Sequence, residues 1–362
     1  MALRVLFDHQ KFSTQKFGGI SRYFNNLLQA IKKDANFDYK LGVLSSRNYY
    51  IQNEKLKLGA AGKILSEPSL AYRINQMYCK NLLNAGHFDV FHPTYYDPYF
   101  INRTRKPVVV TIHDMTYERF PEYFWAHDPL TMQKRLNIER ADHIIAISET
   151  TKNDLIRYSK VDASKVSVIY HGMDLNEPLL TSPVSVPEQY ILFVGDRSGY
   201  KNFYLFIDAI KELSLKYRDL KVILTGGGSM GIADLELLKR LDLENSVMHV
   251  QASDEQLSYL YQNALVFVYP SLHEGFGLPI LEAYQAGCPV LLSDTECFRE
   301  IAGNAALFFE KSEKDSLISK LGRLINDSDL RKSLSRKGTE RLQDFPLDKS
   351  IAETLQVYKS LV

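Results

Sequence analysis

Two glutamates flank a glycine-rich turn in the stretch EGFGLPILE, which spans residues 274–282. Glu274 opens the stretch and Glu282 closes it, with Gly275 and Gly277 between them. Glycine lets the backbone approach a ligand closely, because it carries no Cβ atom. A carboxylate accepts hydrogen bonds from two neighbouring hydroxyls, such as those of a ribose or a hexose. The stretch therefore indicates a site that binds a sugar or a nucleotide.

The elements around this stretch also suit a phosphate. The apolar run LVFVYPS (265–271) predicts a buried strand, and Pro279 is expected in the first turn of a following helix, where proline is tolerated. The unpaired N–H groups at a helix start can receive a diphosphate. An ordinary turn with two solvated glutamates is the alternative, but the complete strand–loop–helix order favours a binding site.

A lysine is expected to supply positive charge near the same kind of ligand. The apolar run YILFVGD (190–196) predicts a strand that ends at Gly195, and Lys201 lies on the loop that follows. A lysine on such a loop either offsets phosphate charge or is a solvated side chain. Arg197 is the nearest further cation on this loop, and it either binds the phosphates or is exposed to solvent.

The first half of the chain holds a second group of candidates. Gly18 and Gly19 separate a predicted strand (4–8) from a predicted helix (18–33). A glycine-rich turn at a helix start can hold a phosphate or a sugar, although Gly-Gly alone often means only a tight turn. Arg22 lies one turn further along, where it either meets an anionic ligand or forms a surface salt bridge.

Further candidates follow two other predicted strands. His113 closes the strongly apolar run PVVVTIHD (107–114), where a histidine is either a satisfied core residue or part of a site. Asp114 either orients the histidine ring or caps the next segment. Tyr95 and Tyr96 lie in the aromatic stretch HPTYYDPYF, and such tyrosines either stack on sugar rings or lie on the surface.

Short apolar runs alternate with helical patterns along most of the chain. Strands that alternate with helices indicate parallel sheets that are covered on both faces. The segment from about 315 to 362 is mostly helical in pattern. Further strands are expected at 88–93, 143–148, 166–172, 221–228, 246–250 and 289–294.

The length of 362 residues predicts two domains, because about 150 residues per domain is usual. The alternation lapses over 176–189, where three prolines predict a linker. The expected fold is therefore α/β, with two Rossmann-like doubly wound domains, residues 1–182 and residues 183–345. Such domains bind ligands at the carboxyl ends of their strands, and with two of them the expected site is the cleft between them.

Composition excludes several classes of protein. Hydrophobic residues make up 45% and charged residues 24%, which excludes a disordered or collagen-like chain. The three cysteines are too few and too irregular for a disulfide framework or a zinc site, and they fit a reducing cytoplasm. No run approaches the ~18 apolar residues of a membrane span, so any membrane contact is expected to be peripheral.

Charge is nearly balanced overall but differs between the two halves. The net charge of +1 is not the strongly positive charge that is typical of a nucleic-acid-binding protein. Residues 1–182 carry 24 Lys/Arg and 18 Asp/Glu, a net of +6, whereas residues 183–362 carry 20 and 25, a net of −5. This asymmetry is either compositional scatter or the mark of a first half that meets an anionic surface or substrate.

Taken together, these motifs resemble those of the family-4 glycosyltransferases, which are retaining enzymes of the GT-B fold. The run EGFGLPILEA is similar to the family's Glu-x7-Glu motif. The runs GGISRYFNNLL, ISETTKNDL, VIYHGMD, FVGDRSGYKN and REIAGNAALFF occur in the family's order and at its spacing. The resemblance covers nearly the whole chain, and it is strongest to bacterial enzymes that assemble surface polysaccharides.

The resemblance implies a role for each candidate residue. Glu282 would bind the ribose of the donor nucleotide, and Glu274 the hydroxyls of the donor sugar. Lys201 would bind the diphosphate and His113 would lie beside the sugar, so the expected catalytic residues are His113, Glu274 and Lys201. The residues expected to bind the donor are Gly18, Gly19, Arg197, Lys201, Gly275, Phe276, Gly277, Leu278 and Glu282. Those expected to bind the acceptor are Arg22, Tyr95 and Tyr96.

One departure from the family pattern concerns the diphosphate. Family members usually place a second basic residue just after the glycine that precedes the lysine or just before that lysine. This chain has Asp196 and Tyr200 at those positions, and Arg197 is the nearest substitute. The resemblance also implies that the last segment, residues 346–362, packs back on the first domain.

The implied reaction is transfer of a hexose from a nucleoside-diphosphate sugar to a lipid-linked saccharide acceptor in surface polysaccharide synthesis. GDP-mannose is the first candidate donor and a UDP-hexose the next. No metal and no other cofactor is expected, and the expected location is the cytoplasm, at the inner face of the membrane. Two alternatives remain. One is a non-catalytic GT-B scaffold in a polysaccharide-assembly complex, and the other is a sugar-nucleotide epimerase, whose acid and base residues are not found.

Overall fold

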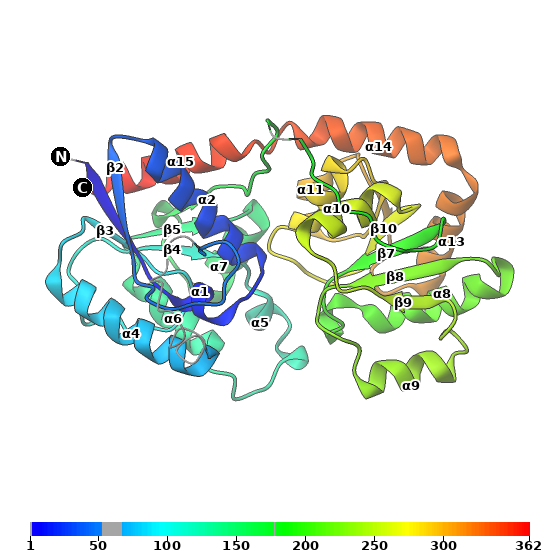
Figure 1. The fold of residues 1–362 in the computed structure, drawn as a ribbon, viewed down its shortest axis with the longest axis horizontal. Coiled ribbons are helices and arrows are strands. Elements are labelled where there is room, and N and C mark those ends of the chain that lie inside the picture. Colours follow the sequence, from blue (N-terminus) through cyan, green and yellow to red (C-terminus); the bar gives the residue numbers. More distant parts are fainter. Residues whose placement is uncertain (1, 53–66, 177) are drawn as a thin grey trace. The chain divides into compact units, whose positions relative to one another are not determined.

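The chain divides into two compact units in the computed structural model, which describes residues 2–52, 67–176 and 178–362 (Figure 1). Unit 1 consists of Met1–His171 together with Asp348–Val362, and unit 2 consists of Gly172–Leu347. The expected boundary after residue 182 therefore falls inside unit 2. Each unit has its own parallel sheet and its own buried core.

The sheet of unit 1 consists of parallel strands in the order β2-β1-β3 and β4-β5-β6. A bridge between Phe91 and Val108 joins the two sets of strands. Because the strands run in the same direction, the carboxyl ends of β1, β3 and β4 lie at one edge of the sheet. The strands are β1 (Leu3–Phe7), β2 (Phe37–Leu41), β3 (Val90–His92), β4 (Val109–Ile112), β5 (His143–Ala146) and β6 (Val166–Val168).

Helices cover both faces of this sheet. Val5 and Phe7 of β1 face a core that α2 completes with Phe24, Leu27 and Leu28, whereas Leu6 of β1 belongs to a second core cluster. The helices of unit 1 are α1 (Gln10–Thr14), α2 (Gly19–Lys33), α4 (Pro68–Ala85), α5 (Thr116–Arg119), α6 (Leu130–Arg140), α7 (Glu149–Ser159) and α15 (Leu347–Ser360), with short 3-10 turns at Pro121–Tyr123 and Ala163–Lys165.

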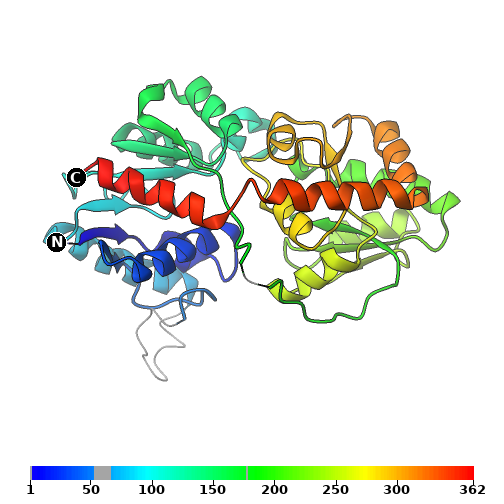
Figure 2. The same ribbon diagram turned by 90° about the horizontal axis from the view of Figure 1, so that it is seen from above.

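The last helix, α15, lies beside α2 in both views (Figures 1 and 2). Its Tyr358 is fully buried and packs edge-on against Phe7 of β1. The Tyr358 hydroxyl lies 2.6 Å from Nδ1 of His92, whose Nε2 lies 2.9 Å from the Thr111 hydroxyl. The chain thus returns after unit 2 to complete the core of unit 1.

Unit 2 contains a parallel sheet in the order β12-β11-β10-β7-β8-β9. Its strands are β7 (Tyr190–Val194), β8 (Lys221–Thr225), β9 (Val247–His249), β10 (Val266–Tyr269), β11 (Val290–Ser293) and β12 (Leu307–Phe309). Its helices are α8 (Phe203–Lys216), α9 (Ile232–Arg240), α10 (Asp254–Asn263), α11 (Leu278–Gln285), α12 (Glu296–Ala302), α13 (Lys314–Asn326) and α14 (Ser328–Leu342), with a 3-10 turn, η3, at Gly199–Lys201.

Strand β10 shows how the two faces of this sheet differ. Val266 and Val268 point into the core that α8 and α13 complete. The alternate residues, Phe267 and Tyr269, contact Tyr261 of α10 and Phe298 of α12 on the opposite face. This alternation is the period-two pattern of a strand that is buried on both faces.

Most of the predicted elements are confirmed. Each expected strand is present, within a few residues of its expected bounds, and 314–360 is helical apart from two short connections. The described residues of the linker 176–189 form no helix or strand. Strands β2 and β12 were not predicted, because FDYKL buries only Phe37 and LFF spans only three residues. Among the described residues, no helix is both long and apolar enough to cross a membrane.

The hydrogen bond between Tyr358 and His92 generates a testable prediction. Replacing Tyr358 by phenylalanine leaves Nδ1 of His92 without its partner in a fully buried site, which costs about 1–3 kcal/mol for such a group. We expect faster hydrogen exchange throughout the unit 1 peptides and unchanged exchange in unit 2. Tyr204→Phe, at a tyrosine that is 55% exposed on α8, is the matched control. Equal protection in Tyr358→Phe and wild type would contradict the prediction.

Candidate functional site

An ion pair between Lys201 and Glu274 joins two loops of unit 2. Lys201 ends the η3 turn after β7, and Glu274 lies in the loop after β10. Strands β7 and β10 are parallel neighbours, so their carboxyl ends deliver both side chains to the same edge of the sheet. The Lys201 Nζ lies 2.6 Å from the Glu274 Oε1, and the two side chains are 12% and 14% exposed.

The surroundings of this pair keep Lys201 charged. Burial alone lowers the pKa of Lys201, but the Glu274 carboxylate outweighs it and holds the pKa well above its ordinary value. The Lys201 ammonium also lies 5.0 Å from the ring centroid of Tyr200 and 5.6 Å from that of Tyr269. Tyr200 replaces a basic residue that the family pattern usually has, and here it contributes an aromatic face to the same cation.

Tyr269, which the sequence analysis missed, holds the carboxylate of Glu274. It is the last residue of β10, and its side chain hydrogen-bonds that of Glu274. Burial and the nearby Glu274 raise the pKa of Tyr269 well above its usual value, so its hydroxyl stays protonated and donates. The available signal was the position of Tyr269 at the end of an apolar strand, on the face opposite to Val268.

The second glutamate of the motif lies on α11. Glu282 is half-buried, and the Tyr261 hydroxyl of α10 lies 3.4 Å from its Oε2. Burial, followed by the charge of Glu282, raises the pKa of Tyr261, so this hydroxyl is also a donor. One glutamate of the pair therefore lies in the loop and the other in the helix.

The glycine-rich run between the glutamates forms the start of α11. Gly277 precedes the helix with φ +97°, in the left-handed region, and a Cβ atom there would lie 3.0 Å from Cδ1 of Ile280. Gly275 and Phe276 are buried, and the Phe276 ring packs edge-on against Phe345. Leu278 is the first helical residue, and no side chain of the described residues caps this helix start. The first turn therefore presents backbone N–H groups next to the ion pair's loop.

Arg197 contacts the loop after β8 and Asp234 of α9. Its Nε donates to Oδ2 of Asp234 at 2.9 Å, and its Nη2 donates to the Ser229 carbonyl at 2.9 Å. It also donates to the carbonyls of residues 226–228 at 3.2–3.4 Å. In this arrangement Arg197 holds the glycine turn after β8, and its predicted contact with a phosphate stays a prediction.

In unit 1, His113 directly follows β4 and packs against His171. The two imidazole rings are stacked with centroids 6.2 Å apart, and the ring of Tyr23 stands edge-on to both. Burial, with His171 as the next cause, lowers the pKa of His113 well below its usual value. Burial and the charge of Arg22 lower the pKa of His171 to about 3. His113 is therefore neutral near pH 7 and can exchange hydrogen bonds with hydroxyls.

The two tyrosines that were predicted to bind the acceptor, Tyr95 and Tyr96, make different contacts. Tyr96 is only 3% exposed, and its hydroxyl accepts from the backbone N–H of His113 at 3.0 Å. It therefore supports His113 rather than offering a ring face. Tyr95 is half-buried, and the Nζ of Lys11 lies 3.3 Å from its ring centroid. Lys11 was not predicted as a site residue.

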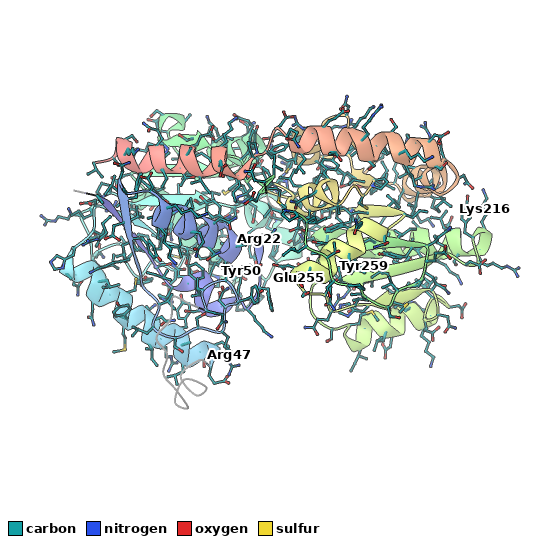
Figure 3. All side chains as sticks on the ribbon, turned by 45° about the horizontal axis from the view of Figure 1, so that its top comes forward. Arg22, Arg47, Tyr50, Lys216, Glu255 and Tyr259 are labelled. Carbon is teal, nitrogen blue, oxygen red and sulfur yellow. The ribbon has the colours of Figure 1, made fainter. Side chains whose placement is uncertain are left out.

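The start of α2 holds the remaining candidates. Gly18 precedes the helix with an extended backbone, and its carbonyl accepts from the backbone N–H of Arg22 at 3.0 Å. Gly19 is the first helical residue and is exposed. The half-buried Arg22 lies on α2 (Figure 3), close enough to His171 to affect its pKa. Within the described residues, no group of three or more His, Cys, Asp or Glu side chains could hold a metal ion.

Two glycosyltransferase families match this chain, one in each half. Residues 17–177 match the family model "Glycosyltransferase Family 4", and residues 182–341 match "Glycosyl transferases group 1". Two parallel α/β units, with paired glutamates at a strand–loop–helix turn of the second, define a glycosyltransferase of the GT-B fold. The chain belongs to the family-4 glycosyltransferases.

Several curated proteins are similar in sequence. O-antigen chain mannosyltransferase RfbU of Salmonella typhimurium is 29% identical over 57% of this chain and 58% of its own length. O-antigen chain mannosyltransferase B of Escherichia coli is 28% identical over 75% of this chain and 74% of its own. An N-acetylgalactosamine-N,N'-diacetylbacillosaminyl-diphospho-undecaprenol 4-alpha-N-acetylgalactosaminyltransferase of Campylobacter jejuni is 26% identical over 60% of each chain.

Solved structures confirm the predicted fold. Sucrose-phosphate synthase from Thermosynechococcus elongatus superposes with a TM-score of 0.77 at 20% identity, covering 100% of this chain and 99% of that one. Anabaena Alr3699/HepE in complex with UDP and glucose gives a TM-score of 0.76 at 18% identity, covering 100% of both chains.

The buried histidines of unit 1 generate a prediction about pH. His171 has a pKa of about 3 in the folded chain, against about 6.5 for an unfolded histidine. Between these values the unfolded state binds more protons, so each such histidine lowers the stability of unit 1 by about 1.4 kcal/mol for each pH unit below about 6.5. We expect His171→Gln to make the stability of unit 1 less dependent on pH in this window.

The measurement is hydrogen exchange of unit 1 peptides, corrected for intrinsic rates, at several pH values between 4.5 and 7.5. The slope against pH is compared, so a constant loss of stability in the variant does not affect the result. His87→Gln, at an exposed histidine of the same unit, is the control and should keep the wild-type slope. An unchanged slope in His171→Gln would show that His171 can be protonated without unfolding.

Proposed function

We propose that the chain transfers a hexose from a nucleoside-diphosphate sugar to a lipid-linked saccharide in the synthesis of a surface polysaccharide. GDP-mannose is the first candidate donor and a UDP-hexose the second. Configuration at the anomeric carbon is retained and no metal takes part. The observation that carries the proposal is the Lys201–Glu274 pair beside the start of α11, with Glu282 on the same helix.

The pair can bind two parts of the donor together. An ammonium has three N–H donors, and Glu274 takes one of them. The remaining donors of Lys201, with the backbone N–H groups at the start of α11, can bind the diphosphate. A carboxylate held by an ammonium and a tyrosine is a hydrogen-bond acceptor and a weak nucleophile, so Glu274 suits sugar hydroxyls. Glu282, held by Tyr261, suits the vicinal hydroxyls of a ribose.

The proposed reaction takes place on one face of the sugar. The bond from the anomeric carbon to the diphosphate oxygen breaks, and a bond to the acceptor oxygen forms on the same face. The departing diphosphate oxygen takes the proton of the acceptor hydroxyl, so no protein base is needed. Lys201 and the α11 start stabilise the negative charge that develops on the diphosphate. Neutral His113 contributes hydrogen bonds to sugar hydroxyls.

The relatives support the donor and the acceptor classes. Two similar proteins are mannosyltransferases of O-antigen chains, which favours GDP-mannose. A third acts on a saccharide that is attached to diphospho-undecaprenol, which favours a lipid-linked acceptor. The net charge of +6 on residues 1–182 suits an anionic acceptor and the inner face of a membrane.

The first experiment measures thermal stabilisation by GDP, UDP, dTDP and their sugars, in EDTA. A ligand at 100 times its dissociation constant stabilises the folded state by about 2.7 kcal/mol. Stabilisation by one nucleotide and its sugar would support the donor site and identify the donor. Stabilisation by none of them, in a folded protein, would overturn the proposal in favour of a scaffold.

The role of Glu274 is tested by Glu274→Gln. Because the amide keeps the size but loses the charge, we expect sugar transfer to fall by roughly 10²–10³-fold, as when one charge-stabilising contact is lost. Stabilisation by the nucleotide without its sugar should remain. Glu255→Gln, at an exposed residue of α10 (Figure 3), is the matched control and should transfer at the wild-type rate. Undiminished polysaccharide production in cells that carry Glu274→Gln would support the scaffold alternative.

Association with a membrane surface gives a further prediction. If the excess positive charge of the first half draws the chain to anionic lipid, binding to vesicles with 30% phosphatidylglycerol should weaken between 50 and 300 mM salt. Vesicles of phosphatidylcholine alone should not bind, which controls for adhesion to lipid in general. Co-sedimentation measures the bound fraction. Absent or salt-insensitive binding would remove the electrostatic argument for a peripheral location.

A further inference from the structure

Lys11 occupies a defined position at the carboxyl edge of the unit 1 sheet. It lies on α1, which follows β1 after a short connection, and its backbone N–H donates to the Thr94 hydroxyl at 3.1 Å. Its Nζ lies 3.3 Å from the ring centroid of Tyr95, a close cation–π contact. Tyr95 belongs to the segment that follows β3, so two strand ends determine where this ammonium lies.

Lys11 differs from Lys134 and Lys201, two other lysines of the described chain that are shielded from solvent. Lys134 pairs with Glu118 at 2.9 Å, and Lys201 pairs with Glu274 at 2.6 Å. Lys11 is half-buried, yet its Nζ has no hydrogen-bond or ion-pair partner within the described residues. Burial lowers its pKa to about 8, and the charge of Asp114 opposes this without reversing it. An ammonium held in this way without a carboxylate is costly unless a ligand completes its contacts.

The neighbours of Lys11 belong to the candidate site. Burial and His171 lower the pKa of His113 most, and the positive charge of Lys11 lowers it further, whereas the charge of Asp114 opposes them. Lys11, Tyr95 and His113 therefore lie within electrostatic range of one another, at the ends of β1, β3 and β4. The other charged group that acts on Lys11 is Asp114, whose Oδ1 accepts from the backbone N–H of Thr116.

We propose that Lys11, supported by the ring of Tyr95, binds an anionic group of the acceptor, either a phosphate or a carboxylate. The cation–π contact holds the ammonium through its charge, so its N–H donors remain available to oxygen atoms of the ligand. This inference rests on the proposed function, since it assumes that unit 1 binds the acceptor. It adds that the acceptor is recognised through a negative charge as well as through its sugar hydroxyls.

Two acceptor types carry such a charge. A lipid-linked saccharide carries its diphosphate, and an acidic saccharide carries the carboxylate of a uronic acid. Inorganic pyrophosphate and glucuronate reproduce these groups separately, and methyl glucoside is a neutral control. A probe that acts on Lys11 itself is needed, because pyrophosphate is also expected to bind at Lys201.

The test uses NMR of the full chain labelled with ¹³C at the lysine Cε. The ring current of Tyr95 should move the Lys11 signal upfield of the other lysines, and Lys11→Met identifies it by its loss. We expect pyrophosphate or glucuronate to shift this signal in a saturable manner, while methyl glucoside does not. A response to pyrophosphate alone assigns the diphosphate, and a response to glucuronate alone assigns the uronic acid. No response to either anion, or an equal response to methyl glucoside, would overturn the inference.

Kinetics then separate this inference from the proposed function. With an acceptor that carries the assigned anion, Lys11→Met should raise the KM for acceptor about tenfold, leaving kcat and the KM for donor within twofold of wild type. Lys11→Arg should restore most of the affinity. Lys80→Met is the matched control, because Lys80 is also half-buried in unit 1 and lies 5.8 Å from the ring centroid of Tyr99.

The failures of the two proposals are distinguishable. If the Lys11 signal responds to an anion but no nucleotide sugar stabilises the chain, the anion site stands and the proposed transfer fails. If wild type transfers sugar and Lys11→Met has an unchanged KM for the anionic acceptor, the transfer stands and this inference fails. An equal rise in KM for a neutral acceptor would also overturn the inference, because it would show a general loss of packing.

Discussion

The ion pair of Lys201 and Glu274 joins the loops that follow β7 and β10, and the geometry of the candidate donor site in unit 2 depends on it. Two buried charges at 2.6 Å are tolerated only where the surrounding groups complete their hydrogen bonds. The parallel pairing of β7 with β10 brings the two loops together, and Tyr269 at the end of β10 supplies a further donor to the carboxylate. The left-handed backbone of Gly277 then turns the chain into α11, so the helix start lies a few residues from Glu274. The position of the ion pair thus depends on the pairing of β7 with β10, and the position of the helix start beside it depends on the turn at Gly277.

The loops after β7 and β8 are joined by a different cation. Gly226, Gly227 and Gly228 all have positive φ, and a Cβ atom on Gly227 would lie 2.5 Å from the Cα of Asp196. Arg197 and its partner Asp234 close this contact through side-chain and backbone hydrogen bonds. The two basic residues of the segment GDRSGYK therefore have different partners, since Lys201 contacts a carboxylate and Arg197 contacts backbone carbonyls.

The sequence was sufficient to predict the fold class, the family and the placement of the glutamate motif. The chain contains the family's Glu-x7-Glu spacing, and its alternating pattern of strands and helices is strong. The contacts of individual side chains were not predictable in the same way. Tyr96 lies beside Tyr95 in sequence, yet one is buried under His113 and the other lies beneath a lysine. Lys11, Tyr261 and Tyr269 carry no motif of their own, because their importance comes from neighbours that are distant in sequence.

The return of α15 to unit 1 has a consequence for biosynthesis. The ribosome completes all six strands of unit 1 before it makes unit 2, and Tyr358 emerges only after both. During that interval His92 lies in a core that lacks its hydroxyl partner, and the face of the sheet beneath α15 lacks its cover. Unit 2 is contiguous in the chain and can reach its final structure first, although its synthesis begins later. The order of folding can therefore be the reverse of the order of synthesis, and a chain that stops before α15 would contain a finished unit 2 attached to an unfinished unit 1.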